Sequence, residues 1–458
     1  MQYDDGITDE RGSLPVLIKA LFLLANLLNK VIFGLALILI ARQVAPDQFG
    51  QFSTYASITN FLLAFLSLGM IEYFLIVHAK DINAATTNLL LWFFIAIISA
   101  LFVSYFFTDT LFFYVLLWTI MTKNAVQLAA SVWQVKAQYR GAVVLYFYAT
   151  ATLIMMLVLF DYYDLHLQRF LQWSILANMP IILLMLLLLK EQRAYFDAFG
   201  SAFLKGSFRF SFSFSLAYVY MSSDVVMLNY LSSSRDAGLY SAATAVLFIT
   251  YLVMDIFYRF FLPYYSKNIG QKGYVYINDF FALVIAVIVP VFLLVAFYHQ
   301  EMIAIIYKRA YGEAAQYMIP LSLILFLHTF CYPLGLVISA RGLQHKKNSI
   351  QMGVALLNIT ANLLLIPFFH VHGAIAATVL SEMLLLYRYY ALAGTVEKNI
   401  HIDWSGFLKT AAGYSVVFLA VFLAFDDKMF SFSILVVLAM LLTIRTVFKS
   451  SIMSNRMP

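Results

Sequence analysis

The sequence has few charged residues and a single cysteine, and it contains no pattern typical of a soluble enzyme. Charged residues make up 11% of the chain, against roughly 25% in soluble globular proteins. The single cysteine, Cys331, excludes an intramolecular disulfide. The sequence has no glycine-rich phosphate loop, zinc-ligand spacing or catalytic triad. We therefore expect no catalytic residues, no metal site, no cofactor and no nucleic-acid partner.

Hydrophobic residues instead account for 63% of the chain. Apolar runs of about 20 residues, long enough to cross a hydrocarbon core of about 30 Å as a helix, recur from Leu14 almost to the C-terminus. We predict an all-α polytopic membrane protein with fourteen transmembrane helices. The expected spans are 15–41, 52–77, 87–107, 111–134, 142–160, 170–189, 207–231, 239–262, 277–298, 317–340, 349–369, 372–393, 408–425 and 429–447.

Lysine and arginine are distributed unevenly between the two sides of these spans. Of the 29 basic residues, twenty fall on one side, six on the other and three within spans. Basic loops are retained on the cytoplasmic side, so both termini are expected to be cytoplasmic. Residues 1–13 hold four acids and one arginine and lack the basic start of a signal peptide. No cleaved signal is expected.

A short pattern appears twice in the chain. The stretches 48–53 (QFGQFS) and 236–241 (DAGLYS) align Gly50 with Gly238, 188 positions apart. The following spans repeat with nearly the same offset, until a longer outer loop at about 299–316 increases it. Six helices are an even number, so the pattern predicts two six-helix lobes of the same orientation, related by an axis along the membrane normal.

The predicted organisation follows from this repeat and from the charge distribution. Two six-helix lobes are joined by a charged linker, and two C-terminal helices have no counterpart in the repeat. The expected parts are a cytoplasmic tail (1–14), the N-lobe (15–189), a cytoplasmic linker (190–206), the C-lobe (207–393), the additional pair of helices (394–447) and a cytoplasmic tail (448–458).

Two lysines lie in the middle of predicted spans of the N-lobe, where a charged side chain costs several kcal/mol to insert. Lys30 has Asn26 one turn before it on the same helix face. Lys123 belongs to a polar stripe that includes Gln127 and is expected to line water. The two ammonium groups could bind a pyrophosphate, with Asn26, Gln127 and Asp224 as further cavity residues. Alternatively, each lysine pairs with a carboxylate across the bundle.

The C-lobe carries acidic residues at membrane depth. Asp224 and Glu382 could each pair with a lysine or bind a coupling proton or Na⁺, because neighbours strongly affect a carboxylate in a low-dielectric site. A structural hydrogen bond near a helix end is the alternative for Asp224. His328 could relay protons, although a satisfied core histidine is the favoured interpretation.

Applying the repeat offset to the charges suggests a gate. Arg259 corresponds to position 71, next to Glu72, and both lie near the cytoplasmic ends of their spans. Glu72 and Arg259 are therefore candidates for a salt bridge between the lobes that closes the cytoplasmic side. The alternative is a local pair between Arg259 and Asp255, four residues apart on one helix.

A first apolar run that ends at Ala41-Arg42 and is followed by Pro46, Phe49 and Gly50 resembles one known family. This family comprises the polysaccharide-type flippases of the multidrug/oligosaccharidyl-lipid/polysaccharide exporter superfamily. Further matching residues are Asp224, Gly238-Leu239-Tyr240-Ser241, Asn358, Asn362, Ile366-Pro367, Gly373-Ala374 and Ala376-Ala377. The resemblance covers residues 15–393. It implies a V-shaped pair of lobes with a cavity that opens alternately to either side of the bacterial inner membrane.

The function implied by this resemblance is transport of a lipid-linked oligosaccharide. The cargo would be an undecaprenyl-pyrophosphate-linked glycan, such as an O-antigen repeat unit for lipopolysaccharide biosynthesis, moved from the cytoplasmic to the periplasmic leaflet. Other partners would be membrane lipid and further glycan-assembly membrane proteins, with a proton or Na⁺ as coupling ion. The alternative is a cation-coupled multidrug antiporter of the same superfamily, which usually has twelve helices. A glycan-assembling enzyme is disfavoured because the longest predicted outer loop has only about 18 residues.

Overall fold

The computed structural model describes residues 14–66, 82–106, 109–135, 138–191, 222–269, 273–397, 400, 404–425 and 427–449. The chain divides into two compact units: unit 1 comprises Met1–Gln43 and Ile58–Ser215, and unit 2 comprises Val44–Ser57 and Leu216–Pro458. All secondary structure in the described residues is helical, in agreement with the all-α prediction. The predicted lobe, linker and tail boundaries stay a prediction.

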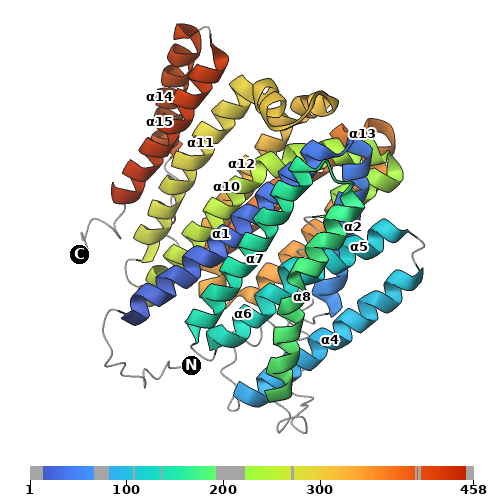
Figure 1. Ribbon diagram of the computed structural model, residues 1–458. Coiled ribbons are helices and arrows are strands. Elements are labelled where there is room, and N and C mark those ends of the chain that lie inside the picture. Colours follow the sequence, from blue (N-terminus) through green and yellow to red (C-terminus); the bar gives the residue numbers. More distant parts are fainter. Residues whose placement is uncertain are drawn as a thin grey trace. The chain divides into compact units, whose positions relative to one another are not determined.

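Unit 1 is a bundle of apolar helices, drawn in blue to green in Figure 1. Its core contains small side chains such as Ala125 and Ala129, which allow the helix backbones to approach closely. The larger Leu90 and Met185 fill the space around them and are fully buried. The helices of this unit are α1 (Leu14–Gln43), α4 (Ile82–Phe106), α5 (Thr110–Thr119), the π-helix η1 (Ile120–Asn124), α6 (Ala125–Val135), α7 (Tyr139–Tyr162) and α8 (Leu167–Glu191).

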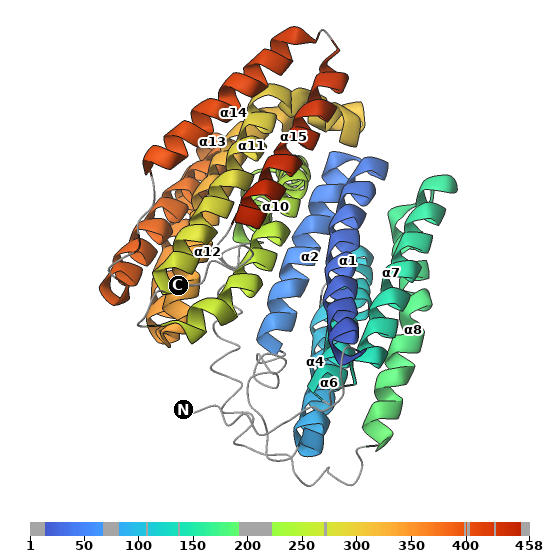
Figure 2. The same cartoon turned by 90° about the vertical axis from the view of Figure 1, so that its left-hand side faces the viewer.

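Unit 2 contains the remaining helices, with α12 packed against α10, α11 and α13. Figure 2 shows α14 and α15 beside α11, and both of them contact it. Ser233 caps the start of α10 by accepting a hydrogen bond from the amide of Asp236 (3.1 Å). The helices are a segment over 222–231, α10 (Ser234–Lys267), α11 (Gly273–Ile306), the 3₁₀-helix η3 (Arg309–Ala314), α12 (Ala315–Ala340), α13 (Gln344–Val396), α14 (Trp404–Ala424) and α15 (Lys428–Lys449).

Helix α13 is a hairpin that contains two of the predicted spans. The chain reverses at His370, which has a φ of 51°. Gly373 follows the reversal, and a Cβ at this position would lie 2.4 Å from the carbonyl oxygen of Leu365 in the first half of the hairpin. Asn358 in the first half donates to Thr378 in the second half (3.1 Å). The hairpin therefore brings polar side chains from both halves together.

Part of the predicted outer loop at 299–316 is helical in the structure. Helix α11 bends at Tyr298, which has non-helical φ and ψ values of −128° and 17°, and then continues to Ile306. The apolar residues after the bend sustain the helix, and η3 follows after a short break. The residues after the bend thus form ordered structure, with η3 next to α12.

Helix α2 (Pro46–Leu66) begins in unit 2 and continues in unit 1. Its first turn is fixed to unit 2 by Tyr311 of η3, which is fully buried. The Tyr311 hydroxyl donates to the carbonyl of Val44 (3.1 Å), and its ring lies edge-on to that of Phe49 at 6.4 Å. Helix η3 therefore anchors the start of α2.

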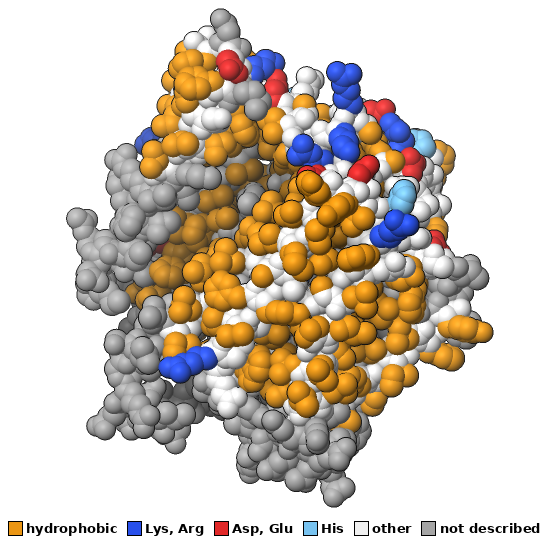
Figure 3. Space-filling view, in the orientation of Figure 1, with side chains coloured by type: hydrophobic (Ala, Val, Ile, Leu, Met, Phe, Trp, Pro, Cys, Tyr) orange, Lys and Arg blue, Asp and Glu red, His pale blue; other side chains and the backbone are white. Residues whose placement is uncertain are grey.

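The surface of the helices is largely apolar, as a lipid environment requires. In the face shown in Figure 3, hydrophobic side chains cover the flanks of the helices and most of the described charges gather toward one end. Exposed examples include Phe102, Val158, Leu364 and Phe368. The described residues contain seven helices long and apolar enough to cross a membrane, or eight if the bent α10 counts as one span. The fold is thus that of a multi-span membrane protein, while the predicted number of fourteen spans is not confirmed.

Candidate functional site

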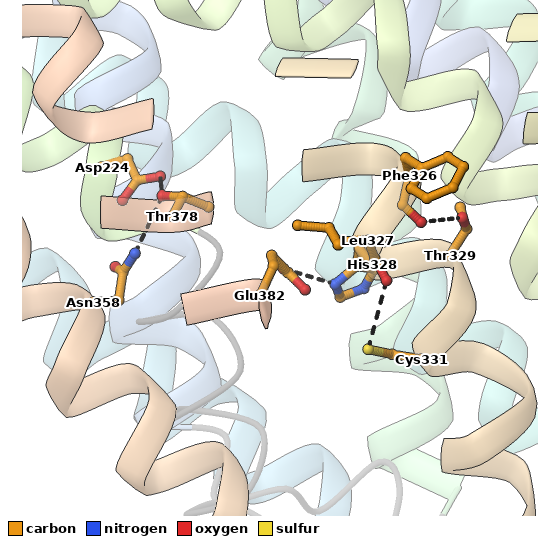
Figure 4. A network of polar contacts seen from close by, with 9 residues as sticks. All are labelled: Asp224, Phe326, Leu327, His328, Thr329, Cys331, Asn358, Thr378 and Glu382. Carbon is orange, nitrogen blue, oxygen red and sulfur yellow. Dashed lines mark hydrogen bonds and ion pairs between the residues drawn. The ribbon is translucent and has the colours of Figure 1, made fainter. Parts of the chain in front are cut away.

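A cluster of polar side chains lies inside unit 2 around Asp224, where the segment 222–231, α10 and α13 meet (Figure 4). Asp224, Asn358, Asn362 and Thr378 are all buried. A buried carboxylate is unfavourable unless it is hydrogen-bonded, neutralised by a proton or paired with a cation. The contacts of this cluster therefore decide what it can bind.

The carboxylate of Asp224 accepts hydrogen bonds on both of its oxygens. Oδ2 accepts from the hydroxyls of Tyr240 (2.8 Å) and Thr378 (2.7 Å). Oδ1 accepts from Nδ2 of Asn362 (2.6 Å). The same amide nitrogen also donates to Oδ1 of Asn358 (3.1 Å). The network joins three helical segments and orients the carboxylate within the apolar unit.

One polar atom of this network is left without a hydrogen bond. Oδ1 of Asn362 is buried and has no partner among the described residues. An unsatisfied buried carbonyl oxygen costs about 1–3 kcal/mol, and this one belongs to the amide whose nitrogen donates to Asp224. Carboxylate, amide and hydroxyl oxygens are the ligands that hard cations prefer. The donor set thus fits a small cation such as Na⁺, and it equally permits a proton on Asp224.

A second buried acidic residue, Glu382, lies on α13, one turn after Thr378. Glu382 accepts a hydrogen bond at Oε1 from Nδ1 of His328 on α12 (2.9 Å), as Figure 4 shows. The two ion-coupling candidates, Asp224 and Glu382, therefore both lie in unit 2 and share α13 as a supporting element. His328 and Glu382 were both candidates from the sequence, but their contact with each other was not predicted.

In unit 1, Lys123 lies in the π-helix η1, in the middle of the span formed by α5, η1 and α6. Its Nζ donates to Oδ1 of Asn60 on α2 (2.9 Å). Single π-turns inside α-helices are rare and frequently occur at functional sites. An ammonium has three donors, and Asn60 takes one of them.

The π-turn changes the predicted polar stripe of this span. Regular helical spacing places Thr119, Lys123, Gln127 and Ser131 on one face, whereas in the structure Thr119 and Ser131 are buried and Gln127 is exposed. Thr119 donates to the carbonyl of Val115 (2.8 Å), and Ser131 donates to that of Gln127 (2.7 Å). Lys123 and Gln127, together with Gln134 three residues after Ser131, are thus the accessible members of the stripe.

Lys30 is half-buried on α1, together with Asn26 on the same face. Its neighbour Asn29 donates to Thr150 of α7 (3.1 Å), and Phe22 contacts Tyr139 at the start of α7 (5.5 Å). Helices α1 and α7 therefore run in the same direction. Helix α6 ends at Val135, α7 begins at Tyr139, and the two helices pack against each other, so they run in opposite directions and α1 runs opposite to α5 and α6.

One aromatic contact sets the relative depth of the two lysines. The rings of Phe33 on α1 and Trp118 on α5 stack at 5.3 Å. Lys30 precedes Phe33 by three residues and Lys123 follows Trp118 by five, which corresponds to about 4.5 and 7.5 Å along antiparallel axes. The two lysines thus lie at similar depth in unit 1.

The proposed gate residues are only partly described by the structure. Glu72 lies outside the described residues, so its pairing with Arg259 stays a prediction. Arg259 Nε contacts Asp255 Oδ2 at 3.1 Å within α10, which is the local pair considered as the alternative. Within the described residues, no group of three or more His, Cys, Asp or Glu side chains could hold a metal ion.

Several members of the Asp224 network were not predicted as site residues. Tyr240, Asn358 and Asn362 appeared in the sequence only as part of the family resemblance, and Thr378 was not identified. Their signal is the spacing of Asn358 with Asn362, and of Thr378 with Glu382, each four residues apart in an apolar run.

No protein-family model matches the chain, and no curated protein matches it in sequence. Solved structures do match its fold. The lipid II flippase MurJ in an inward closed conformation has a TM-score of 0.73 and 14% identity, covering 95% of this chain and 100% of that chain. A multidrug resistance MATE family transporter of the MOP superfamily has a TM-score of 0.57 and 11% identity in its inward-facing conformation, covering 85% and 100%. An outward-facing structure of a multidrug resistance MATE family transporter of the MOP superfamily has a TM-score of 0.56 and 12% identity, and the match covers 86% of this chain and 98% of that chain. The chain therefore shares its fold with these structures.

Proposed function

We propose that this chain is a flippase for an undecaprenyl-pyrophosphate-linked glycan, such as an O-antigen repeat unit. It moves this cargo from the cytoplasmic to the periplasmic leaflet of a bacterial inner membrane by alternating access, and both of its termini are cytoplasmic. The observation that supports this function best is the match of 95% of the chain to a lipid II flippase at a TM-score of 0.73. The multidrug transporters match less well, with TM-scores of 0.57 and 0.56.

The lysines of unit 1 support an anionic cargo. Lys30 and Lys123 lie at similar depth in apolar helices, where a cation is costly and is usually retained for function. An ammonium is a point charge suited to phosphate oxygens. In this proposal Lys30 and Lys123 bind the pyrophosphate, and Asn26 and Gln127 contribute further polar contacts. The polyprenyl chain stays in the membrane lipid.

The Asp224 cluster of unit 2 supports coupling to a cation. Na⁺ would be bound by oxygens of Asp224, Asn358, Asn362 and Thr378. The oxygen of Asn362, which has no hydrogen bond, would then have a cation to coordinate. A bound cation supplies positive charge that compensates the buried carboxylate. The side chains of unit 2 hold and orient these oxygens through the network described above.

The function can be tested in the source cell by deleting the gene and assaying lipid-linked glycan on each leaflet of the inner membrane. Loss of surface glycan, with accumulation of the lipid-linked precursor on the cytoplasmic leaflet, is the expected result. Re-expression of the wild-type chain restores surface glycan, whereas the Lys123→Gln variant restores it poorly. Unchanged surface glycan together with new drug sensitivity would instead identify a multidrug antiporter.

A further inference from the structure

The pair formed by His328 and Glu382 has a property that the Asp224 cluster lacks: one member reaches the surface of unit 2 and the other does not. The side chain of His328 is 21% exposed, while that of Glu382 is 3% exposed. Their Nδ1 and Oε1 atoms are 2.9 Å apart. A proton can therefore reach the imidazole while the carboxylate remains shielded from water.

Helices α12 and α13 pack against each other, and both carry buried apolar side chains, such as Leu334 and Val337 in α12 and Ala377 and Leu385 in α13. Buried ion pairs often contribute little to stability compared with apolar residues of similar size, because desolvation offsets their attraction. Ionisable groups at membrane depth are, as a rule, retained for function.

The surroundings concentrate the change of charge on the histidine. The rings of Tyr251 and Tyr332 lie edge-on to His328, at 5.4 and 5.7 Å. In model peptides near neutral pH, tyrosine and cysteine are neutral, whereas histidine titrates. Burial lowers the pKa of Lys347 to about 8, so this lysine is charged throughout the lower pH range in which histidine titrates. Titratable groups that interact with Glu382 or its neighbours come from all three helices around the pair: Tyr251 and Asp255 from α10, Cys331 and Tyr332 from α12, and Tyr389 and Lys347 from α13.

The pair is also connected to the cation site. Glu382 follows Thr378 by one turn of α13, about 6 Å along the axis, and Thr378 donates to Asp224. On α10, Tyr240 donates to Asp224, and Tyr251 of the same helix lies edge-on to His328 at 5.4 Å. The pair and Asp224 are therefore linked by contacts along both α13 and α10.

We infer that His328 and Glu382 form a proton-binding site that competes electrostatically with cation binding at Asp224. This inference rests on the proposed cation coupling of the transporter. With Nδ1–H of the neutral imidazole donating to Glu382, a proton from water adds to the lone pair of Nε2. The pair changes from a net charge of −1 to an imidazolium–carboxylate pair of zero charge, and no other bond forms or breaks. Removing this negative charge weakens the attraction for a cation at Asp224.

The test is calorimetric titration of the purified full chain with NaCl across a range from about pH 5 to about pH 7, below the pKa of about 8 of Lys347. The expected result for wild type is that the Na⁺ affinity falls by about tenfold or more on acidification. Glu382→Gln, which removes the same negative charge, is expected to bind Na⁺ weakly and to lose further affinity only at a lower pH than wild type, where His328 of this variant titrates. His328→Gln, in which the new side chain is uncharged at every pH, is expected to lose the pH dependence and to keep the Na⁺ affinity that wild type has at the upper end of the range.

Two exposed substitutions in the same unit serve as matched controls. His345→Gln, at the start of α13, and Glu313→Gln, in the surface pair with Arg235, are expected to leave the pH dependence intact. An unchanged Na⁺ affinity across this pH range in wild type, or a wild-type pH dependence in either Glu382→Gln or His328→Gln, would overturn the inference. Neither result depends on a lipid substrate, so failure of the flippase assay is a separate outcome.

A direct measurement of the histidine covers the case in which Na⁺ does not bind. The ¹⁵N NMR signal of His328 is assigned by its loss in the His328→Gln variant and then followed through the pH range. It is expected to titrate in wild type, and to titrate at lower pH in Glu382→Gln because the carboxylate no longer stabilises the imidazolium. A His328 signal that stays in one charge state throughout would contradict a proton site.

Discussion

Gly50 of α2 and Gly238 of α10 pack against each other's helix in a reciprocal manner. A Cβ at position 50 would lie 1.8 Å from the carbonyl oxygen of Ser234, and a Cβ at position 238 would lie 1.9 Å from that of Pro46. In each case the glycine faces the carbonyl four residues before the other glycine. The contact therefore has a local two-fold relationship, and both glycines are needed for the two backbones to approach this closely.

Substitution of either glycine by alanine is expected to destabilise this helix crossing. The atoms that oppose the new methyl group belong to the backbone, so they cannot move aside like the end of a flexible side chain. Overpacking of this kind costs about 1–3 kcal/mol. Gly50→Ala and Gly238→Ala should each lower the midpoint of thermal unfolding in detergent by several degrees.

Gly353→Ala provides the matched control for this prediction. Position 353 lies in α13 and has open space around the added Cβ. Alanine is favoured over glycine by about 0.5–1 kcal/mol within a helix, so this variant should be as stable as wild type or slightly more stable. An unfolding midpoint of Gly50→Ala equal to that of Gly353→Ala would show that the crossing is not tightly packed in the protein.

The repeat illustrates what the sequence could predict about the fold. The spacing of 188 residues related Gly50 to Gly238, and long apolar runs predicted helices because the bilayer leaves few alternatives. An offset cannot show that two equivalent positions touch each other, because contact depends on how the helices pack. The same limit applies to Tyr298, where α11 bends and then continues through residues predicted as loop.

Tyr311 gives a second prediction, about the start of α2. Its buried hydroxyl donates to the carbonyl of Val44, so Tyr311→Phe leaves that acceptor unsatisfied while the ring packing is kept. The expected loss is about 1 kcal/mol of unfolding free energy, measured by thermal unfolding. Tyr387→Phe, at an exposed position on α13, is the control and should have no measurable effect. Equal stability of the two variants would contradict the anchoring role of Tyr311.

Asp224 gives a third prediction, about cation binding. If Na⁺ binds only the folded protein, it should raise stability by about 2.7 kcal/mol at a hundredfold excess over its Kd. Thermal unfolding of wild type in NaCl, compared with choline chloride at equal ionic strength, should show this increase. Asp224→Asn preserves the shape of the side chain and removes its charge, so the Na⁺-dependent increase should disappear.

Glu313→Gln controls for a general effect of removing an acid, since Glu313 forms an exposed pair with Arg235. This variant should keep the Na⁺-dependent increase. Retention of the full increase in Asp224→Asn would place the cation elsewhere in the chain.

Lys123 gives a fourth prediction, about the cargo. If its ammonium binds a phosphate, Lys123→Gln should lose a charge-assisted hydrogen bond worth about 1.5–3 kcal/mol, and the apparent affinity for lipid-linked glycan should fall by about tenfold to a hundredfold. Lys123→Arg should retain part of this affinity. Lys346→Gln, at an exposed position of α13, is the control with an equal loss of charge. A lower stability of Lys123→Gln with unchanged cargo affinity would favour the structural role.

The ionisable residues of the candidate site were predictable because burying a charge is costly. The uncharged residues, and the contacts between side chains, were not predictable because they depend on local packing. Asp224, Glu382 and Lys123 were identified because an ionisable group at membrane depth requires an explanation. Thr378 and Asn362 were not, since hydroxyl and amide side chains are common at helix contacts in membranes. The π-turn at Lys123 adds a residue to one turn, which regular spacing cannot reveal, and the contact between His328 and Glu382 depends on how α12 packs against α13.

The most direct test of the proposed function is transport by the purified protein in proteoliposomes. The probe is an undecaprenyl-pyrophosphate-linked oligosaccharide with a fluorescent label on the sugar, present in both leaflets, and the membrane-impermeant reductant dithionite bleaches the label that reaches the outer leaflet. With the wild-type chain, label from both leaflets should be bleached, whereas protein-free vesicles and vesicles with Asp224→Asn should lose only the label of the outer leaflet. Bleaching by wild-type vesicles that is no greater than in protein-free vesicles would contradict the account.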